Sequence, residues 1–232
     1  MITEQDDDGL DPLDPGFADQ FAPSVLEACQ LYIISPGKLG TEFDDRLTEA
    51  LGAGPVAAFQ LRLKDVPDDE IIRVAERLIP ICARHETAFI LNDRMDLAKK
   101  CGADGVHLGQ SDGDPRAARA LLGPTAQIGV TCHDSRHLAM EAGEAGADYV
   151  AFGAFHPTTT KETFHRPDPS ILTWWTALFE IPCVAIGGIT PDNGRVLVEA
   201  GADFLAVSNA VWGHKEGPAG AVKAFQAILQ RN

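Results

Sequence analysis

A loop rich in hydroxyl groups, Pro157-Thr158-Thr159-Thr160-Lys161, closely follows the apolar run Tyr149-Val150-Ala151-Phe152. Hydroxyl and backbone N–H groups donate hydrogen bonds and a lysine supplies a point charge, so such a loop can surround a phosphoryl group. A solvated threonine-rich surface loop is the alternative, and the loop alone does not separate the two. Polar segments that follow other apolar runs favour the phosphate hypothesis.

A second polar set alternates with leucine in Phe59-Gln60-Leu61-Arg62-Leu63-Lys64. Successive side chains of a strand point to opposite faces, so Gln60, Arg62 and Lys64 should share one face. Two cations and an amide are costly to bury without partners, which makes an anionic ligand a natural occupant of that face. A surface strand with salt bridges is the alternative.

Two carboxylates follow two consecutive apolar runs. Asp93 comes after Ala88–Leu91, and Asp112 comes shortly after Gly105–Leu108. Neighbouring parallel strands would bring both to the same rim, where Mg²⁺ held by few carboxylates usually carries a substrate phosphate. Each aspartate could instead cap the helix that follows it. His107, inside the second run, could be a hydrogen-bonded core histidine.

Further hydrogen-bond donors follow three later runs. Thr131 could donate to a ligand, and His133 could cap the next helix or orient a neighbour. The glycines of Gly187-Gly188 and the segment Ser208-Asn209 suit the phosphate site that barrels of alternating strands and helices commonly form there. That site belongs to the fold in general, so it indicates a phosphate without indicating the reaction.

The elements that must position these residues alternate along the chain. Segments with helical period, such as Asp68–Arg84 and Pro191–Ala200, separate short apolar runs. Eight such units in 232 residues predict a closed (β/α)8 TIM barrel over residues 29–232, and an open doubly wound sheet is the alternative. Residues 1–28, rich in Asp, Pro and Gly, are expected to form an acidic flexible arm. The eight runs are Leu31–Ile34, Val56–Leu61, Ala88–Leu91, Gly105–Leu108, Ala126–Val130, Tyr149–Phe152, Cys183–Ile186 and Phe204–Val207.

A Gly-Ala-Asp pattern recurs before three of these runs, with its aspartate at Asp104, Asp148 and Asp203. Glycine suits the end of a helix, and the next run then enters a strand. These aspartates should therefore lie at the N-terminal ends of strands. Barrel chemistry occupies the opposite ends, so we assign the three to stability.

Composition narrows the class of protein. A net charge of −15 argues against a nucleic-acid partner, which needs a basic face. No run approaches the length of a membrane span, and the acidic start of the chain lacks the features of a signal peptide. Five scattered cysteines are typical of reduced thiols. We expect a cytoplasmic protein.

The motifs together resemble the thiamine phosphate synthase family, also called thiamine-phosphate pyrophosphorylase. They occur in the family's order from about residue 31 to about residue 230, and six in sequence are far more specific than any one of them. The matching pieces are Gln60-Leu61-Arg62 with Lys64, Asn92-Asp93-Arg94, Asp104 to Gln110 with Asp112, Gly129-Val130-Thr131 with His133, Pro157-Thr158 with Thr160-Lys161, and Gly187-Gly188-Ile189.

The resemblance implies a transferase that joins 4-amino-2-methyl-5-(diphosphooxymethyl)pyrimidine to a thiazole phosphate and releases thiamine phosphate and diphosphate. Asp93 and Asp112 would hold Mg²⁺. Thr131 stands where the family usually has serine. Gln60, Arg62, Lys64, Asn92 and Lys161 would bind the pyrimidine diphosphate, and Thr158, Thr160 and Gly188 the thiazole phosphate, with Ser208 and Asn209 also among the substrate-binding positions. Arg62, Lys64, Thr131 and Lys161 are the expected catalytic residues.

Departures from the family pattern gather on the thiazole side. They are His156, the segment after Lys161 and Asn209, so the acceptor is less well specified than the diphosphate chemistry. The alternatives are a thiazole-phosphate tautomerase, a family member with another acceptor, and a non-catalytic protein that binds a thiamine precursor. The sequence leaves the oligomeric state open, and a homodimer is one assembly that it allows.

Overall fold

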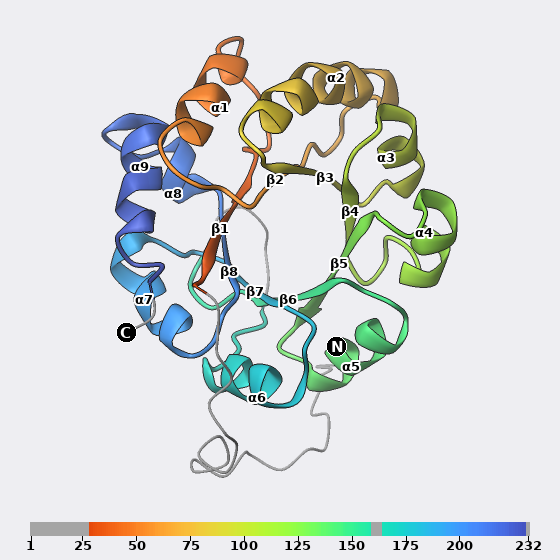
Figure 1. The fold of residues 1–232 in the computed structure, drawn as a ribbon, viewed down its shortest axis with the longest axis vertical. Helices are drawn as coiled ribbons and strands as arrows, with labels where there is room; N and C mark the ends of the chain where they lie inside the picture. Colours follow the sequence, from red (N-terminus) through yellow and green to blue (C-terminus); the bar gives the residue numbers. More distant parts are fainter. Residues whose placement is uncertain (1–27, 159–163, 231–232) are drawn as a thin grey trace.

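The structure, a computed structural model, describes residues 28–158 and 164–230. In these residues eight parallel strands pair in chain order, and β8 pairs with β1, so the sheet closes into a barrel (Figure 1). The predicted (β/α)8 barrel is confirmed, and the open sheet is excluded. The strands are β1 (Gln30–Ile34), β2 (Ala58–Leu61), β3 (Ala88–Asn92), β4 (Gly105–Leu108), β5 (Gln127–His133), β6 (Tyr149–Gly153), β7 (Cys183–Ile186) and β8 (Phe204–Val207).

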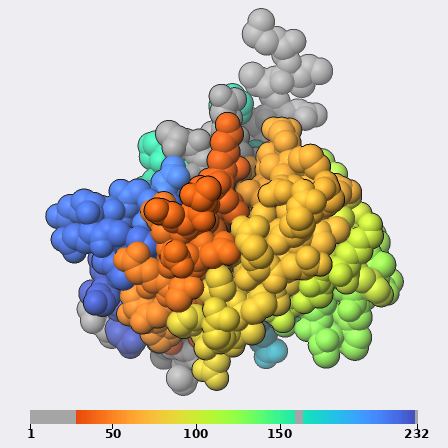
Figure 2. Space-filling view, turned by 90° about the horizontal axis from the view of Figure 1, so that it is seen from above, coloured from red at the N-terminus to blue at the C-terminus, as the bar shows by residue number. Residues whose placement is uncertain are grey.

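Helices follow the strands and form the outer ring of the molecule (Figure 1). The ring closes where the C-terminal segment meets the beginning of the barrel: α9 packs against α1, and blue lies beside orange in Figure 2. The helices of the described residues are α1 (Phe43–Leu51), α2 (Asp68–Arg84), α3 (Met95–Cys101), α4 (Pro115–Leu122), α5 (Arg136–Glu144), α6 (Ser170–Leu178), α7 (Pro191–Glu199), α8 (Asn209–Trp212) and α9 (Gly217–Gln226).

The two faces of each strand have different neighbours. Outward side chains such as Phe59, Leu61 and Val106 are buried against the helices in one large apolar cluster. Inward side chains, among them Tyr32, Ile90 and Val184, form a second, smaller cluster inside the barrel. Period-two alternation therefore separates a helix-facing core from an interior that can include polar groups.

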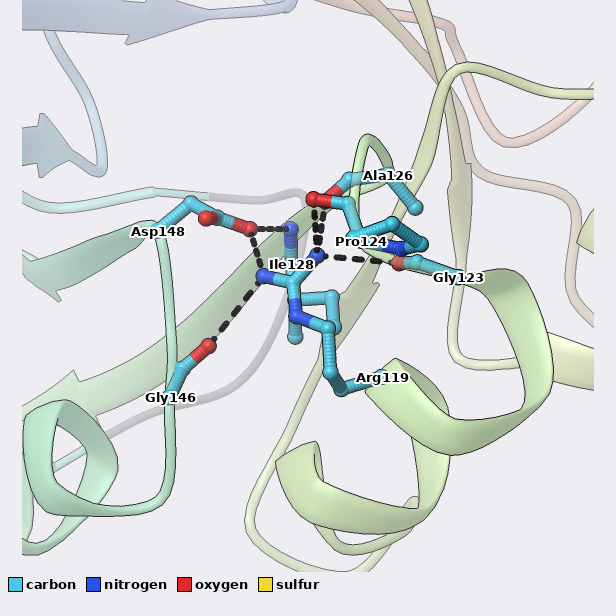
Figure 3. A network of polar contacts seen from close by, with 7 residues as sticks. All are labelled: Arg119, Gly123, Pro124, Ala126, Ile128, Gly146 and Asp148. Carbon is cyan, nitrogen blue, oxygen red and sulfur yellow. Dashed lines mark hydrogen bonds and ion pairs between the residues drawn. The ribbon is translucent and has the colours of Figure 1, made fainter.

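The N-terminal ends of the strands are tied together by the three aspartates of the Gly-Ala-Asp pattern. Each precedes an even-numbered strand and accepts a backbone N–H from the preceding strand. Asp148 Oδ2 lies 2.6 Å from Ile128 N and 2.6 Å from Arg119 Nη2 (Figure 3). These carboxylates bind the protein's own backbone, in agreement with the structural role predicted for them.

The predicted acidic arm, residues 1–28, lies outside the described residues except for Ala28. None of the helices in the described residues has the length and apolar character needed to cross a membrane. Trp174 and Trp175 of α6 are buried, and the Trp175 ring stacks on Phe179 with centroids 4.2 Å apart.

Candidate active site

A cavity of about 350 Å³ opens at the C-terminal ends of the strands. Its wall contains polar side chains from loops that are far apart in the sequence. Eleven predicted site residues line it: Gln60, Arg62, Lys64, Asn92, Asp93, Asp112, Thr131, Thr158, Gly188, Ser208 and Asn209. The other two, Thr160 and Lys161, lie outside the described residues.

The cations that follow β2 reach the cavity as predicted, although the strand ends at Leu61. The backbone N–H of Arg62 donates to Ser35 Oγ over 2.9 Å. This hydrogen bond holds the segment that follows β2 beside the end of β1. Lys64 is half-exposed, and its Nζ lies 3.6 Å from Asp93 Oδ2. The predicted face of polar side chains is thus present, and it is continuous with a carboxylate of the next loop.

Asp93 and Asp112 are not helix caps. The N-cap of α3 is Arg94, and that of α4 is Asp114, whose side chain accepts from Arg116 N. Asp93 has a φ of 65°, in the left-handed region that most residues avoid. Asp112 turns back on its own loop, with Oδ2 accepting from Gly109 N over 3.2 Å. Their side chains meet at the rim of the cavity, so the capping alternative is wrong.

Burial and the neighbouring carboxylate of Asp112 raise the pKa of Asp93, while the Lys64 ammonium acts in the opposite direction. Two adjacent carboxylates repel unless a proton or a cation lies between them. No cluster of three or more His, Cys, Asp or Glu side chains suited to a metal occurs in the described residues. A pair of carboxylates fits an ion such as Mg²⁺ that takes its remaining oxygen ligands from a substrate phosphate and water.

Below the rim, a chain of buried polar side chains crosses the barrel interior. Gln60 Nε2 donates to Tyr32 Oη, which lies 2.9 Å from Tyr149 Oη. Tyr149 Oη is 3.1 Å from His107 Nδ1, and His107 Nε2 is 2.8 Å from Thr131 Oγ1. His107 is thus a hydrogen-bonded core histidine that also lines the cavity.

The sequence interpretation missed Tyr32 and Tyr149, which it included in apolar runs. Each has the inward parity of its strand: Tyr32 pairs with Ala58, two residues before Gln60, and Tyr149 pairs with Gly129, two residues before Thr131. A tyrosine on an inward position would have been the signal for a polar partner inside the barrel.

His133 does not cap α5, because Ser135 does so by accepting from Leu138 N. The register of β5 with β6 shifts between Thr131 and His133, which brings both side chains to the cavity wall. The His133 ring stacks on His165 with centroids 4.3 Å apart, and His165 Nδ1 lies 2.7 Å from Asp134 Oδ1. Of the two predicted roles, contact with a neighbour is the one observed.

The glycine segment after β7 approaches the loop after β6 closely. Gly188 has a φ of 63°, and a Cβ there would lie 2.3 Å from the carbonyl oxygen of Pro157. Asn193 of α7 holds the segment by donating from Nδ2 to Gly188 O over 3.1 Å. Only glycine fits this contact, which places backbone beside Thr158 at the cavity wall.

Comparison with known proteins gives a consistent result. Residues 31–211 match the family model described as thiamine monophosphate synthase. The chain is 57% identical over 203 residues to the thiamine-phosphate synthase of Rhodospirillum centenum, covering 87% of this chain and 98% of that protein. It is 60% identical over 200 residues to that of Erythrobacter litoralis, covering 84% and 93%. The solved thiamine phosphate pyrophosphorylase of Pyrococcus furiosus superposes with a TM-score of 0.77 at 32% identity, over 86% of this chain and 95% of that one.

Proposed function

Because the chain belongs to the thiamine monophosphate synthase family, we propose that its barrel mouth joins a pyrimidinylmethyl diphosphate to a thiazole phosphate. The products are thiamine phosphate and diphosphate, and the protein is a transferase of thiamine biosynthesis. The observation that carries the assignment of the site is one cavity lined by two cations, two carboxylates and a glycine-rich loop.

The diphosphate is assigned to the side of the cavity formed after β2 and β3. Arg62 and Lys64 supply positive charge there, and Asn92 offers an amide from the end of β3. Lys161, outside the described residues, is proposed to add a third cation from the loop after β6. Fixed positive charge stabilises the charge that develops on a leaving diphosphate, since the groups are already oriented when the bond breaks.

Asp93 and Asp112 are proposed to hold Mg²⁺ together with the diphosphate oxygens. When bound, the ion would neutralise charge on the leaving group. The raised pKa of Asp93 supports this role, because a cation between the two carboxylates replaces the proton that their repulsion favours. Lys64, 3.6 Å from Asp93, lies close enough to act on the same phosphate.

The proposed reaction does not require a covalent bond between a substrate and the protein. The C–O bond to diphosphate breaks, the electron-rich pyrimidine carries the positive charge left on its methylene group, and the thiazole nitrogen forms the new C–N bond. The protein's residues bind both substrates, orient them and exclude water. Gln60 and Thr131 both line the cavity. Gln60 is proposed to contact the reacting pyrimidine, and Thr131 the diphosphate that leaves it.

The thiazole phosphate is assigned to the opposite side, formed by Thr158, Gly188 and Ser208, with Thr160 from outside the described residues. Backbone near glycine can approach a phosphate closely. Asn209 is exposed at the start of α8 and borders the same wall. It would help to bind this acceptor.

The test is a reconstituted reaction. Full-length protein, Mg²⁺ and both substrates should give thiamine phosphate and diphosphate in equal amounts, the first measured by chromatography and the second as phosphate after treatment with pyrophosphatase. Omission of either substrate is the control for hydrolysis. A protein that isomerises the thiazole phosphate without coupling it, or that binds both substrates without turnover, would overturn the proposal in favour of a tautomerase or a binding protein.

A further inference from the structure

The chain of buried hydrogen bonds inside the barrel has a direction. It connects five strands in the order Gln60, Tyr32, Tyr149, His107 and Thr131, with links of 2.9, 2.9, 3.1 and 2.8 Å. Its two ends, Gln60 and Thr131, line the cavity. Each link holds one proton and each hydroxyl has one proton to donate, so with every hydroxyl proton kept within the chain the direction of the first link sets the direction of all the others.

The protons can be assigned in order. Gln60 Nε2–H donates to Tyr32, so the Tyr32 hydroxyl donates to Tyr149, and the Tyr149 hydroxyl donates to His107 Nδ1. Nδ1 therefore carries no proton, and a neutral His107 has its proton on Nε2, which donates to Thr131 Oγ1. The Thr131 proton remains for a group in the cavity. Rotation of the Gln60 amide by half a turn would reverse every link and leave Thr131 with lone pairs only.

The charge of the cavity selects the first direction. Arg62 and Lys64, together with the Mg²⁺ that Asp93 and Asp112 are proposed to hold, make an anion the natural occupant, and an anion accepts hydrogen bonds. A hydroxyl that donates stabilises such a group, whereas one that offers lone pairs repels it. We propose that Tyr149 is a positioning residue, which fixes the Nε2–H tautomer of His107 and so makes Thr131 a hydrogen-bond donor to the leaving group. The identity of that group as diphosphate rests on the proposed function.

The residues around Tyr149 allow its contact with His107. A Cβ on Gly129 would lie 1.9 Å from Tyr149 Cζ, so glycine at this position leaves room for the end of the ring. The Tyr149 ring also stacks on that of His107, with centroids 5.7 Å apart. Burial raises the pKa of both Tyr32 and Tyr149, so their hydroxyls keep their protons near neutral pH.

The direction of the chain also affects its other end. With its amide N–H donating to Tyr32, Gln60 has its Oε1 available as an acceptor for a positively polarised pyrimidine. Hydrogen bonds in a series polarise one another, so charge developing at Thr131 and at Gln60 strengthens the same chain. No proton needs to leave it: every hydrogen stays on its own oxygen or nitrogen, and only the strength of the links changes.

A nuclear magnetic resonance experiment tests the tautomer. Full-length protein with ¹⁵N-labelled histidine contains seven such residues, and the His107 signals are assigned by their loss in His107→Asn. We expect the Nε2–H tautomer both without ligand and with inorganic diphosphate and Mg²⁺. Without ligand, Tyr149→Phe should give a mixture of tautomers, and so should Tyr32→Phe, because the direction that Gln60 sets then no longer reaches Tyr149. An Nδ1–H tautomer in the wild type, or an unchanged spectrum in Tyr149→Phe, would overturn the proposal.

A kinetic double-mutant cycle tests the consequence for catalysis. Tyr149→Phe should lower kcat about tenfold with little change in KM, the size expected for one hydrogen bond. In the Thr131→Val background the same substitution should cost nothing further, because the hydroxyl that it positions is gone. Equal losses in both backgrounds would show that Tyr149 acts independently of Thr131. Wild-type protein that makes no thiamine phosphate would refute the proposed function, and the tautomer experiment would still decide the direction of the chain.

Discussion

The two ends of the barrel carry aspartates with opposite surroundings. At the N-terminal end, Asp104, Asp148 and Asp203 each accept a backbone N–H over 2.6 to 2.8 Å. At the mouth, Asp93 lies beside Asp112, and burial together with that second carboxylate raises its pKa. Aspartate side chains are therefore hydrogen-bonded to the protein backbone at one end of the barrel, whereas at the other end two of them repel each other.

The difference shows what the interactions of each carboxylate stabilise. Hydrogen bonds to the protein's own backbone stabilise the fold, and a carboxylate that makes them has little capacity left to bind a ligand. A carboxylate pair that repels itself weakens the folded state slightly, but a bound cation relieves the repulsion. A barrel can separate these roles because the N-terminal ends of its parallel strands all lie at one rim and the C-terminal ends all lie at the other.

The largest effect is expected at the mouth. Asp93→Asn and Asp112→Asn should each lower kcat by about a hundredfold or more, or roughly 3 kcal/mol of transition-state stabilisation. The matched controls are Asp104→Asn and Asp203→Asn at the other rim, which should keep nearly full kcat. Steady-state assays of the four variants measure the contrast, and wild-type turnover in Asp93→Asn would show that the rims do not differ in this way.

The next effect concerns linkage between metal and ligand. Mg²⁺ should bind the free protein weakly, and diphosphate should tighten it about tenfold or more, with reciprocal tightening of diphosphate by Mg²⁺. Asp93→Asn and Asp112→Asn should remove most of this coupling, whereas Asp203→Asn should retain it. Calorimetric titration of diphosphate with and without Mg²⁺ measures it. Equal affinity under the two conditions would exclude the proposed metal role.

A stability effect of intermediate size is expected at the N-terminal rim. Asp148 accepts from both Ile128 N and Arg119, so Asp148→Asn should lower the free energy of unfolding by about 1.5 kcal/mol. Asp104→Asn should cost less, because the asparagine oxygen can still accept the single backbone N–H. Urea unfolding followed by circular dichroism gives both values. Equal losses would mean that the Arg119 contact contributes nothing.

The smallest effect is a pH dependence at the mouth. Because the folded-state pKa of Asp93 is raised above that of the unfolded chain, its contribution to stability is complete below the unfolded pKa and is lost as the pH rises through the folded one. Asp93→Asn should therefore gain stability relative to wild type between acid and neutral pH. Urea unfolding across that range measures the gain, which Mg²⁺ with diphosphate should abolish. A constant difference at all pH values would contradict the assignment.

Much of the barrel could be predicted because its signals are local. The runs Gly105–Leu108, Cys183–Ile186 and Phe204–Val207 coincide with β4, β7 and β8. In a barrel, parity within a strand and position at its C-terminal end are enough to send a side chain such as Gln60 to the mouth. Lys161 could be predicted by the same rule, and its position stays untested because it lies outside the described residues.

Contacts between distant strands could not be predicted in this way. Tyr32 and Tyr149 are 117 residues apart in the chain, and α5 and β6 lie between His133 and His165. Neither pair has a spacing pattern that would reveal it. Such contacts depend on the register and the shear with which the barrel closes, which no local segment contains.

The sequence by itself determined the eight strands, the rim on which the polar site residues of the described part lie and the family to which its motifs point. Tertiary structure alone decided which of those residues share hydrogen bonds and what charge state they prefer. The physical reason is that strand formation and facing depend on neighbours one or two positions away, whereas a pKa or a chain of hydrogen bonds depends on burial and on groups brought together only when the barrel closes.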